Sequence, residues 1–178
     1  SPVADSRVVT FARRIEMPSF KLNPWGIDVL IVGPSFYRDL NEHSGWRSLQ
    51  FGAPWWDVVL PTAAALMGYT VQRIDAPVAF HASHEQRWSR TDWRIAGDYA
   101  RAFLVYLARQ MQVTDFPEHK DLHEFHFAMR AWRDARTASV KMLVAPSLIQ
   151  DAMWRFANRG VVVKKKSAWV RFKRRIGL

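Results

Sequence analysis

The feature that most restricts the fold is a nearly unbroken apolar segment at residues 26–32, Gly-Ile-Asp-Val-Leu-Ile-Val. A strand that is apolar on both faces needs neighbouring strands at its edges and a layer of structure over each face. The chain has the means to supply them, because 49% of its residues are hydrophobic and only 24% are charged. We therefore expect an α/β protein with this strand inside a sheet.

Residues 1–90 are expected to form one unit of short strands and helices. Gly68 is placed to end the longer helix, and Pro61 is placed to kink it. Strands are expected at residues 7–15, 26–32, 69–74 and 77–81, and helices at residues 34–40 and 54–67.

Residues 91–163 are expected to form a helical extension. Thr91 is the predicted N-cap of its first helix, and further helices are predicted over residues 121–143 and 146–158. The helix that follows Thr91 carries apolar residues at helical spacing, which predicts a face that packs against the rest of the protein. They are Ile95, Tyr99, Ala102, Phe103, Tyr106 and Leu107.

Residues 164–178 form a basic tail, which supplies seven positive charges and no acid to a net charge of +10. If the tail is helical, Trp169, Phe172 and Ile176 share one face, which is typical of a helix that lies on an anionic membrane surface. A partner's groove, a nucleic-acid arm and a solubilising tail are the alternatives. The basic residues are Lys164, Lys165, Lys166, Arg171, Lys173, Arg174 and Arg175.

Several function classes are excluded or disfavoured by what the sequence lacks. The chain contains no cysteine, which excludes disulfides, cysteine–zinc sites and thiol catalysis. It contains no phosphate-binding loop, no dinucleotide-binding glycine motif and no serine nucleophile motif. No apolar run reaches the roughly 20 residues of a membrane span, and residues 1–14 do not resemble a signal peptide. We expect a cytoplasmic protein, peripheral at the inner face of the membrane.

Asp57 is the first candidate for chemistry. It lies in the expected first turn of a helix, whose positive end favours the ionised carboxylate and suits a general base or a hydrogen-bond acceptor. Trp55 and Trp56 offer flat apolar faces on which sugar rings or bases stack. In the alternative interpretation, the aspartate only stabilises the helix start and both tryptophans belong to the core.

Histidines form two further candidate groups. His81 and His84, followed by Glu85, lie at the end of an expected strand and are candidate ligands of a divalent metal or contacts for phosphate. In the alternative, both are half-exposed loop residues. His119, His123 and His126 would share one face of a helix, but their spacing does not match a zinc-protease motif, and a solvated helix start is favoured.

The order of four segments in the first half resembles a known family. Residues 25–32 match a G-x-D-hydrophobic strand, residues 51–57 match a G-R-P-x-W-D helix start, residues 68–71 follow, and residues 79–88 contain H-x-x-H. Together they resemble the C-terminal, acceptor-side half of bacterial glycosyltransferase-like proteins with a GT-A fold, which use nucleotide-sugar donors. The resemblance covers roughly residues 8–90.

This resemblance implies a partial GT-A-like mixed sheet and transfer of a sugar from a nucleotide-sugar to a glycan or lipid-linked acceptor. It implies that Asp57 is the base or acceptor anchor and that Asp28 lines the acceptor side together with Trp55 and Trp56. It implies that His81 or His84 completes a site for Mn²⁺ or Mg²⁺ and the diphosphate. Ala53 stands where the family pattern commonly has arginine.

The main departure from the family is the missing D-x-D motif: the chain has eleven aspartates, and no two are separated by a single residue. The donor half is therefore expected to lie outside this chain, which alone would be inactive. In the alternative, the chain is a non-catalytic binding or assembly module. An incomplete sheet also leaves open edges, so we expect self-association or a covering partner segment.

Overall fold

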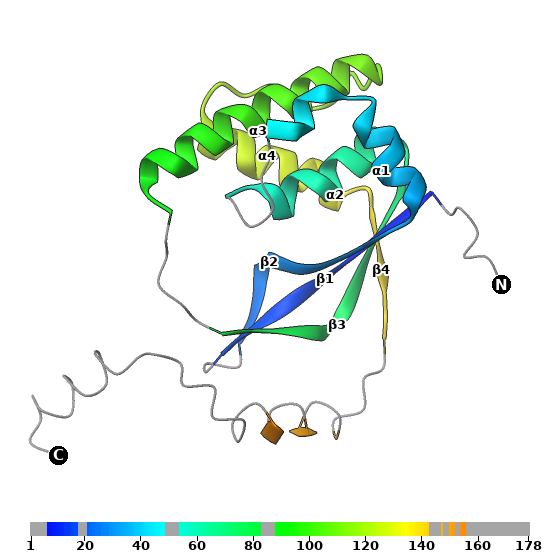
Figure 1. Ribbon diagram of the computed structural model, residues 1–178, viewed down its shortest axis with the longest axis vertical. Helices are drawn as coiled ribbons and strands as arrows, with labels where there is room; N and C mark the ends of the chain where they lie inside the picture. Colours follow the sequence, from blue (N-terminus) through cyan, green and yellow to red (C-terminus); the bar gives the residue numbers. More distant parts are fainter. Residues whose placement is uncertain are drawn as a thin grey trace, which may run out of the picture.

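The computed structural model describes residues 7–17, 21–48, 54–82 and 88–142, together with residues 147, 150, 151, 154 and 155. It shows a mixed α/β fold, as the sequence predicts (Figure 1). The elements are β1 (Val8–Met17), β2 (Lys21–Val32), α1 (Pro34–Asn41), the 3-10 helix η1 (Ser44–Ser48), α2 (Trp56–Leu66), β3 (Thr70–Ala82), α3 (Arg90–Gln110), α4 (Leu122–Asp134) and β4 (Thr137–Val140).

The four strands form one mixed sheet in the order β2-β1-β3-β4. β1 runs antiparallel to β2 and parallel to β3, and β3 runs parallel to β4. The apolar segment of residues 26–32 is the second half of β2, which pairs only with β1 in the described part of the chain. Ile31 of this strand is 56% exposed. The expectation of an interior strand with two covered faces was therefore wrong, because β1 and β3 occupy the middle of the sheet.

β3 is one long strand where two strands were expected. Its pairing with β1 is interrupted, because Ala12 pairs with Ile74 and the next partners are Arg14 and Ala79. Pro77 lies in this irregular stretch, where a residue without an N–H is tolerated. The pairing of β1 with β2 also shifts on both sides of Arg13. Such a bulge changes which sheet face the following side chains point to.

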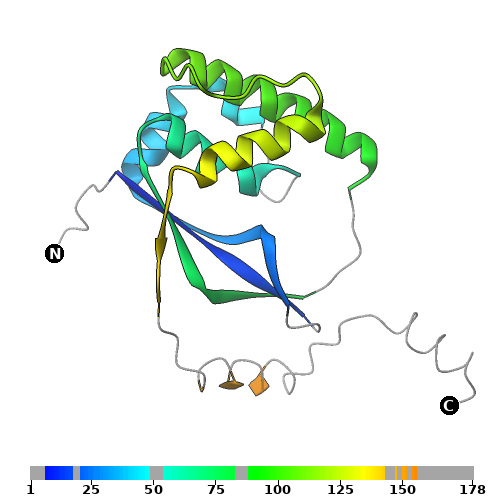
Figure 2. The ribbon, with the colours of Figure 1, turned by 180° about the vertical axis from the view of Figure 1, so that it is seen from behind.

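The helices gather over one face of the sheet, as Figures 1 and 2 show from opposite sides. α2 lies at the centre of this layer and contacts α3, α4 and the sheet. Val59 of α2 and Phe103, Leu104 and Leu107 of α3 belong to the same buried core as Val9 of β1. The second half of the chain therefore shares one core with the first half. No described helix is both long and apolar enough to cross a bilayer.

In the second half, the start of α3 and the end of α4 differ from the prediction. α3 begins two residues earlier than expected, because the N-cap is Ser89 and not Thr91, and Ser89 forms a reciprocal capping box with Asp92. α4 ends at Asp134, and residues 137–140 form β4 where the helix was expected to continue. Pairing with the edge of β3 overrides the helical tendency of this segment. The predicted helix of residues 146–158 lies largely outside the described residues.

The apolar residues of α3 divide between two environments. Phe103 and Leu107 are buried, as predicted, whereas Ile95, Tyr99 and Tyr106 are about half exposed. Successive residues of a helix are turned by about 100°, so these two sets lie on different faces. The stripe that the sequence suggests is therefore wider than the face that packs against α2.

Candidate charged site and aromatic cavity

Asp57 is the second residue of α2 and is partly buried. Burial raises the pKa of its carboxyl group, and this outweighs hydrogen bonding to its own backbone, the charges of Arg14 and Arg130, and a backbone hydrogen bond from Ile27. The expected effect of the helix end on this carboxylate is therefore opposed by desolvation, which is the largest influence on its pKa. Residues of β1, β2 and α4 therefore all influence the pKa of this carboxyl group.

A chain of polar side-chain contacts runs from Arg14 through Glu16 to His81 at the neighbouring strand ends. Arg14 Nε donates to Glu16 Oε1 at 2.8 Å, and Glu16 Oε2 lies 2.9 Å from His81 Nδ1. Glu16 and His81 are register partners in β1 and β3. The three side chains are about a quarter exposed. Arg14 is therefore linked to His81 through Glu16, and its charge also lowers the pKa of Asp57.

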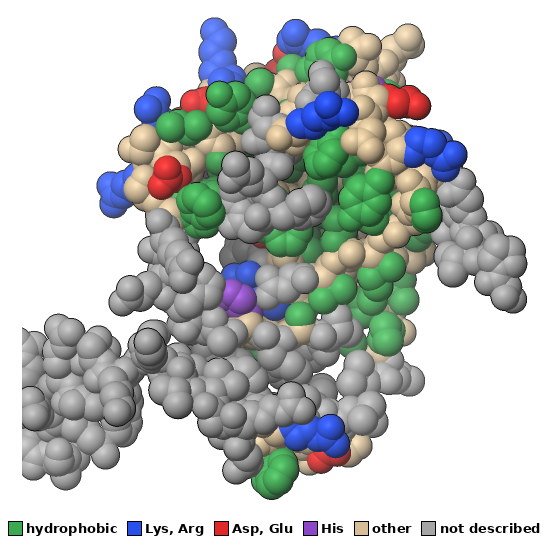
Figure 3. All heavy atoms as spheres, in the orientation of Figure 1, with side chains coloured by type: hydrophobic (Ala, Val, Ile, Leu, Met, Phe, Trp, Pro, Cys, Tyr) green, Lys and Arg blue, Asp and Glu red, His purple; other side chains and the backbone are tan. Residues whose placement is uncertain are grey.

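Figure 3 shows a hollow between the helical layer and the sheet, with histidine and Lys or Arg side chains on its floor. Arg130 of α4 is buried, with only 6% of its surface exposed. Burial and the neighbouring Arg133 lower the pKa of Arg130 to about 10, while Asp134 and Asp57 act in the opposite direction. The buried Arg130 of α4 and the partly buried Asp57 of α2 thus influence each other's pKa.

The remaining predicted residues of the acceptor side have different environments. Trp55 is only 6% exposed, and its indole Nε1 donates to the carbonyl oxygen of Trp93 at 3.0 Å. It therefore packs in the core and does not offer an open stacking face. Trp56 is partly exposed, and Asp28 lies in β2 at the shift of register with β1. The basic tail, residues 164–178, lies outside the described residues.

The predicted metal ligands do not form a cluster in the described part of the structure. His81 is held by Glu16, and His84 lies outside the described residues. No group of three or more histidine, aspartate or glutamate side chains within the described ranges is arranged to hold a metal ion. The Mn²⁺ or Mg²⁺ of the family resemblance therefore remains a prediction.

The second histidine group is dispersed over the start of α4. His119 precedes the helix and lies 3.6 Å from Glu124, and His123 is exposed. His126 is partly buried, with its ring 4.9 Å from that of Trp55 in an edge-to-face contact. Burial first, and then the charges of Arg130, Arg133 and His123, lower the pKa of His126 to about 4. His126 is therefore neutral at physiological pH.

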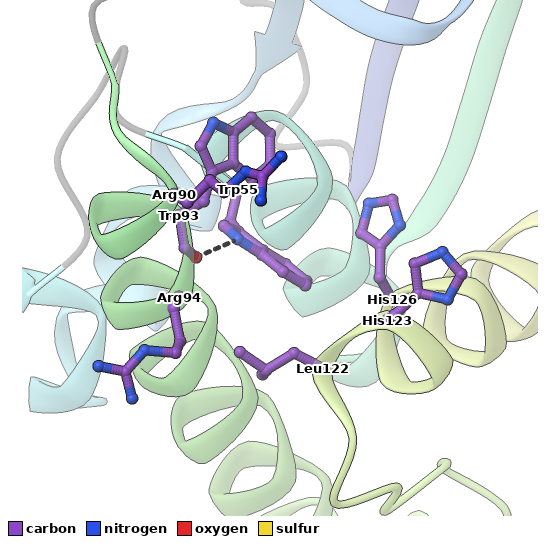
Figure 4. A pocket seen from close by; sticks show the side chains of 7 residues that line it. All are labelled: Trp55, Arg90, Trp93, Arg94, Leu122, His123 and His126. Atoms are coloured by element: carbon purple, nitrogen blue, oxygen red, sulfur yellow. Dashed lines mark hydrogen bonds between the residues drawn. The ribbon is translucent and has the colours of Figure 1, made fainter.

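A cavity of about 560 Å³ opens beside Trp55, between the first turns of α3 and α4 (Figure 4). Sequence reasoning missed most of its lining, although the capping pattern around Ser89 marks the helix start that carries three of the residues. The cavity is lined by Trp55, Arg90, Trp93, Arg94, Leu122, His123 and His126.

Comparisons of the chain with protein-family models, with curated proteins and with solved structures found no match. The charged site around Asp57 and the cavity beside Trp55 are therefore the two structural features that bear on function.

Proposed function

We propose that this chain is the acceptor-side part of a glycosyltransferase that moves a sugar from a nucleotide-sugar to a glycan or lipid-linked acceptor. Asp57 is the general base in this proposal. The acceptor hydroxyl gives its proton to the Asp57 carboxylate as its oxygen bonds to the anomeric carbon of the donor, and the bond to the nucleoside diphosphate breaks.

The observation that carries this proposal is the environment of Asp57. A general base is most effective when its pKa approaches the working pH, and burial moves the pKa of Asp57 in that direction. Arg14 and Arg130 keep the carboxylate available in its charged form. Glu16 holds the Arg14 guanidinium in place through a 2.8 Å hydrogen bond. The site thus combines desolvation with fixed positive charge, a pairing typical of catalytic carboxylates.

Binding of the acceptor tests the proposal without the donor half. Saturation-transfer NMR on the purified chain, with a panel of neutral and acidic oligosaccharides, should detect a bound saccharide. Asp57→Asn should weaken its binding several-fold, because the amide nitrogen replaces an acceptor of hydrogen bonds. Asp98→Asn is the matched control, since Asp98 is a half-exposed carboxylate on α3 that pairs with Arg101.

Two further readouts address the donor side. Nucleotide release from UDP- and GDP-sugars with Mn²⁺, measured with and without acceptor, reports any transfer that the chain performs. A calorimetric titration with UDP and GDP, with and without Mn²⁺, reports a donor site, and metal-dependent binding lost in His81→Ala would assign His81 to it. A folded chain that binds no saccharide and no nucleotide would overturn the proposal.

We also propose peripheral attachment to the inner face of the membrane through residues 164–178. Seven basic residues with interleaved Trp169 and Phe172 suit an anionic lipid surface, and a lipid-linked acceptor would be found there. Co-sedimentation with vesicles containing phosphatidylglycerol tests this attachment. Binding should be lost on removal of residues 164–178 and should be absent with vesicles of neutral lipid.

A further inference from the structure

The walls of the cavity beside Trp55 are apolar and aromatic. The rings of Trp55 and Trp93 are 6.4 Å apart and tilted by 57°, and Leu122 lies across from them (Figure 4). Trp93 is 42% exposed, so part of its indole is open to a ligand. An exposed indole beside an apolar wall suits the C–H face of a sugar ring, and the volume of about 560 Å³ is in the range of ligand pockets.

The charges of the lining are all positive. Arg90 and Arg94 extend from the first turns of α3, and neither makes an ion pair or a hydrogen bond with the described residues. The nearby carboxylates are used elsewhere: Asp92 accepts from Ser89, and Asp121 caps α4 by accepting from backbone N–H groups. No carboxylate is among the described residues that line the cavity.

The position of the two arginines gives the fold no evident stabilisation. Cations are disfavoured near the N-terminus of a helix, where the helix dipole is positive. Arg90 is the first residue of α3, and it has no carboxylate partner among the described residues to compensate. A neutral His126 adds hydrogen-bonding capacity to the cavity without charge. The two arginines therefore remain available to an anionic group brought by a ligand.

We propose that this cavity binds an acidic sugar unit of the acceptor, a pyranose ring that bears a carboxylate or phosphate group. The ring lies against Trp93 and the apolar wall, Arg90 beside the Trp93 indole holds the oxyanion, and Arg94 adds positive charge to the lining. This inference rests on the proposed function, because it names the class of acceptor that Asp57 would deprotonate.

The test is a calorimetric titration with a glucuronate-containing disaccharide and with the corresponding neutral glucose disaccharide. The acidic sugar should bind at least tenfold more tightly than the neutral one. The double variant Arg90→Gln/Arg94→Gln should reduce this ratio to about one. Arg101→Gln is the matched control on α3, because Arg101 does not line the cavity, and it should retain the ratio. Trp93→Ala should weaken both sugars.

Three outcomes would overturn the inference. Acidic and neutral sugars could bind equally, Arg101→Gln could act like the double variant, or inorganic phosphate could bind as tightly as the acidic sugar, which would indicate an anion site without sugar recognition. The proposed function is tested separately. Asp57 does not line the cavity, so Asp57→Asn should leave this charge preference intact. Acidic-sugar binding without any effect of Asp57 would support the cavity and contradict the catalytic role.

Discussion

Glu16 and His81 lie opposite each other on the parallel strands β1 and β3, with a carboxylate oxygen 2.9 Å from the imidazole Nδ1. A direct cross-strand pair of this kind is expected to show a coupling of about 0.2–1 kcal/mol. Urea unfolding of Glu16→Gln, His81→Asn and the double variant measures it as a double-mutant cycle. A coupling of zero within error would show that the pair adds nothing to stability.

Asp57 should make the stability of the protein depend on pH in a direction unusual for an aspartate. Its folded-state pKa is raised above the ordinary value of 3.8, so the native state keeps a proton that the unfolded chain releases. The free energy of unfolding should therefore fall as pH rises from about 3.8 through the folded-state pKa. Asp57→Asn should lack this part of the profile and gain stability relative to the wild type over this window. The opposite slope would contradict the raised pKa.

His126 should reduce stability on the acidic side of neutrality. Its pKa falls from 6.5 to about 4 on folding, so the unfolded chain binds a proton that the native state does not. The free energy of unfolding should fall as pH drops from 6.5 towards 4, with a slope of at most about 1.4 kcal/mol per pH unit from this residue. His126→Gln should flatten the profile in that window when both proteins are unfolded with urea at pH 7 and pH 5. An unchanged profile would count against a buried neutral imidazole.

Gly97 lies where α3 approaches the indole of Trp55. A Cβ atom there would lie 2.8 Å from Trp55 Cζ2 and 3.1 Å from Leu122 Cδ1. Alanine normally stabilises a helix interior relative to glycine, but Gly97→Ala should destabilise the protein by about 1–3 kcal/mol through overpacking. The substitution should also disturb the cavity that Trp55 and Leu122 line. Asp98→Ala, on the exposed side of the same turn, is the control and should be nearly neutral. Thermal unfolding of the two variants checks the difference.

Gly68 adopts a left-handed backbone, with a φ of 76°, just after α2. No atoms crowd the position of a Cβ there, so the cost of a side chain comes from the backbone alone. Gly68→Ala should lower the free energy of unfolding by about 1 kcal/mol, and Gly68→Asn should cost less, because asparagine tolerates this conformation. Urea unfolding of the two variants compares them, and an equal cost would contradict the backbone explanation.

The sequence predicts the local elements of the first half well. Local signals predict these elements, because each signal determines the structure of only the few residues around it. The signals are the apolar run of residues 26–32, the proline at the start of α1, and Gly68 after α2. The errors concern pairing. Pro77 indicates a break between two strands, but the bulge opposite Arg13 absorbs it. Residues 137–140 become a strand because the edge of β3 lies beside them, and no local pattern contains that information.

The candidate site is predictable only in part for the same reason. Asp57 and His81 stand out because each lies at the end of an element. Arg14, Glu16 and Arg130 carry no motif, and their importance follows from interactions between residues more than 40 positions apart. Trp55 and Trp93 show that a conspicuous sequence pattern can also point to the wrong residue. Two adjacent tryptophans suggest an open platform at residues 55 and 56, yet the tryptophan with the more accessible ring beside the cavity comes from α3.

The position of β4 has a consequence for how the chain assembles. Val8 pairs with Thr70, and Val71 pairs with Thr137, so both parallel pairings close long loops. Topologies dominated by such distant pairings fold slowly, commonly in milliseconds to seconds. During synthesis, the far edge of β3 has no partner until residues 137–140 leave the ribosome. The edge of β3 at residues 71–74 is therefore open to mispairing for most of the synthesis, until the four residues of β4 pair with it.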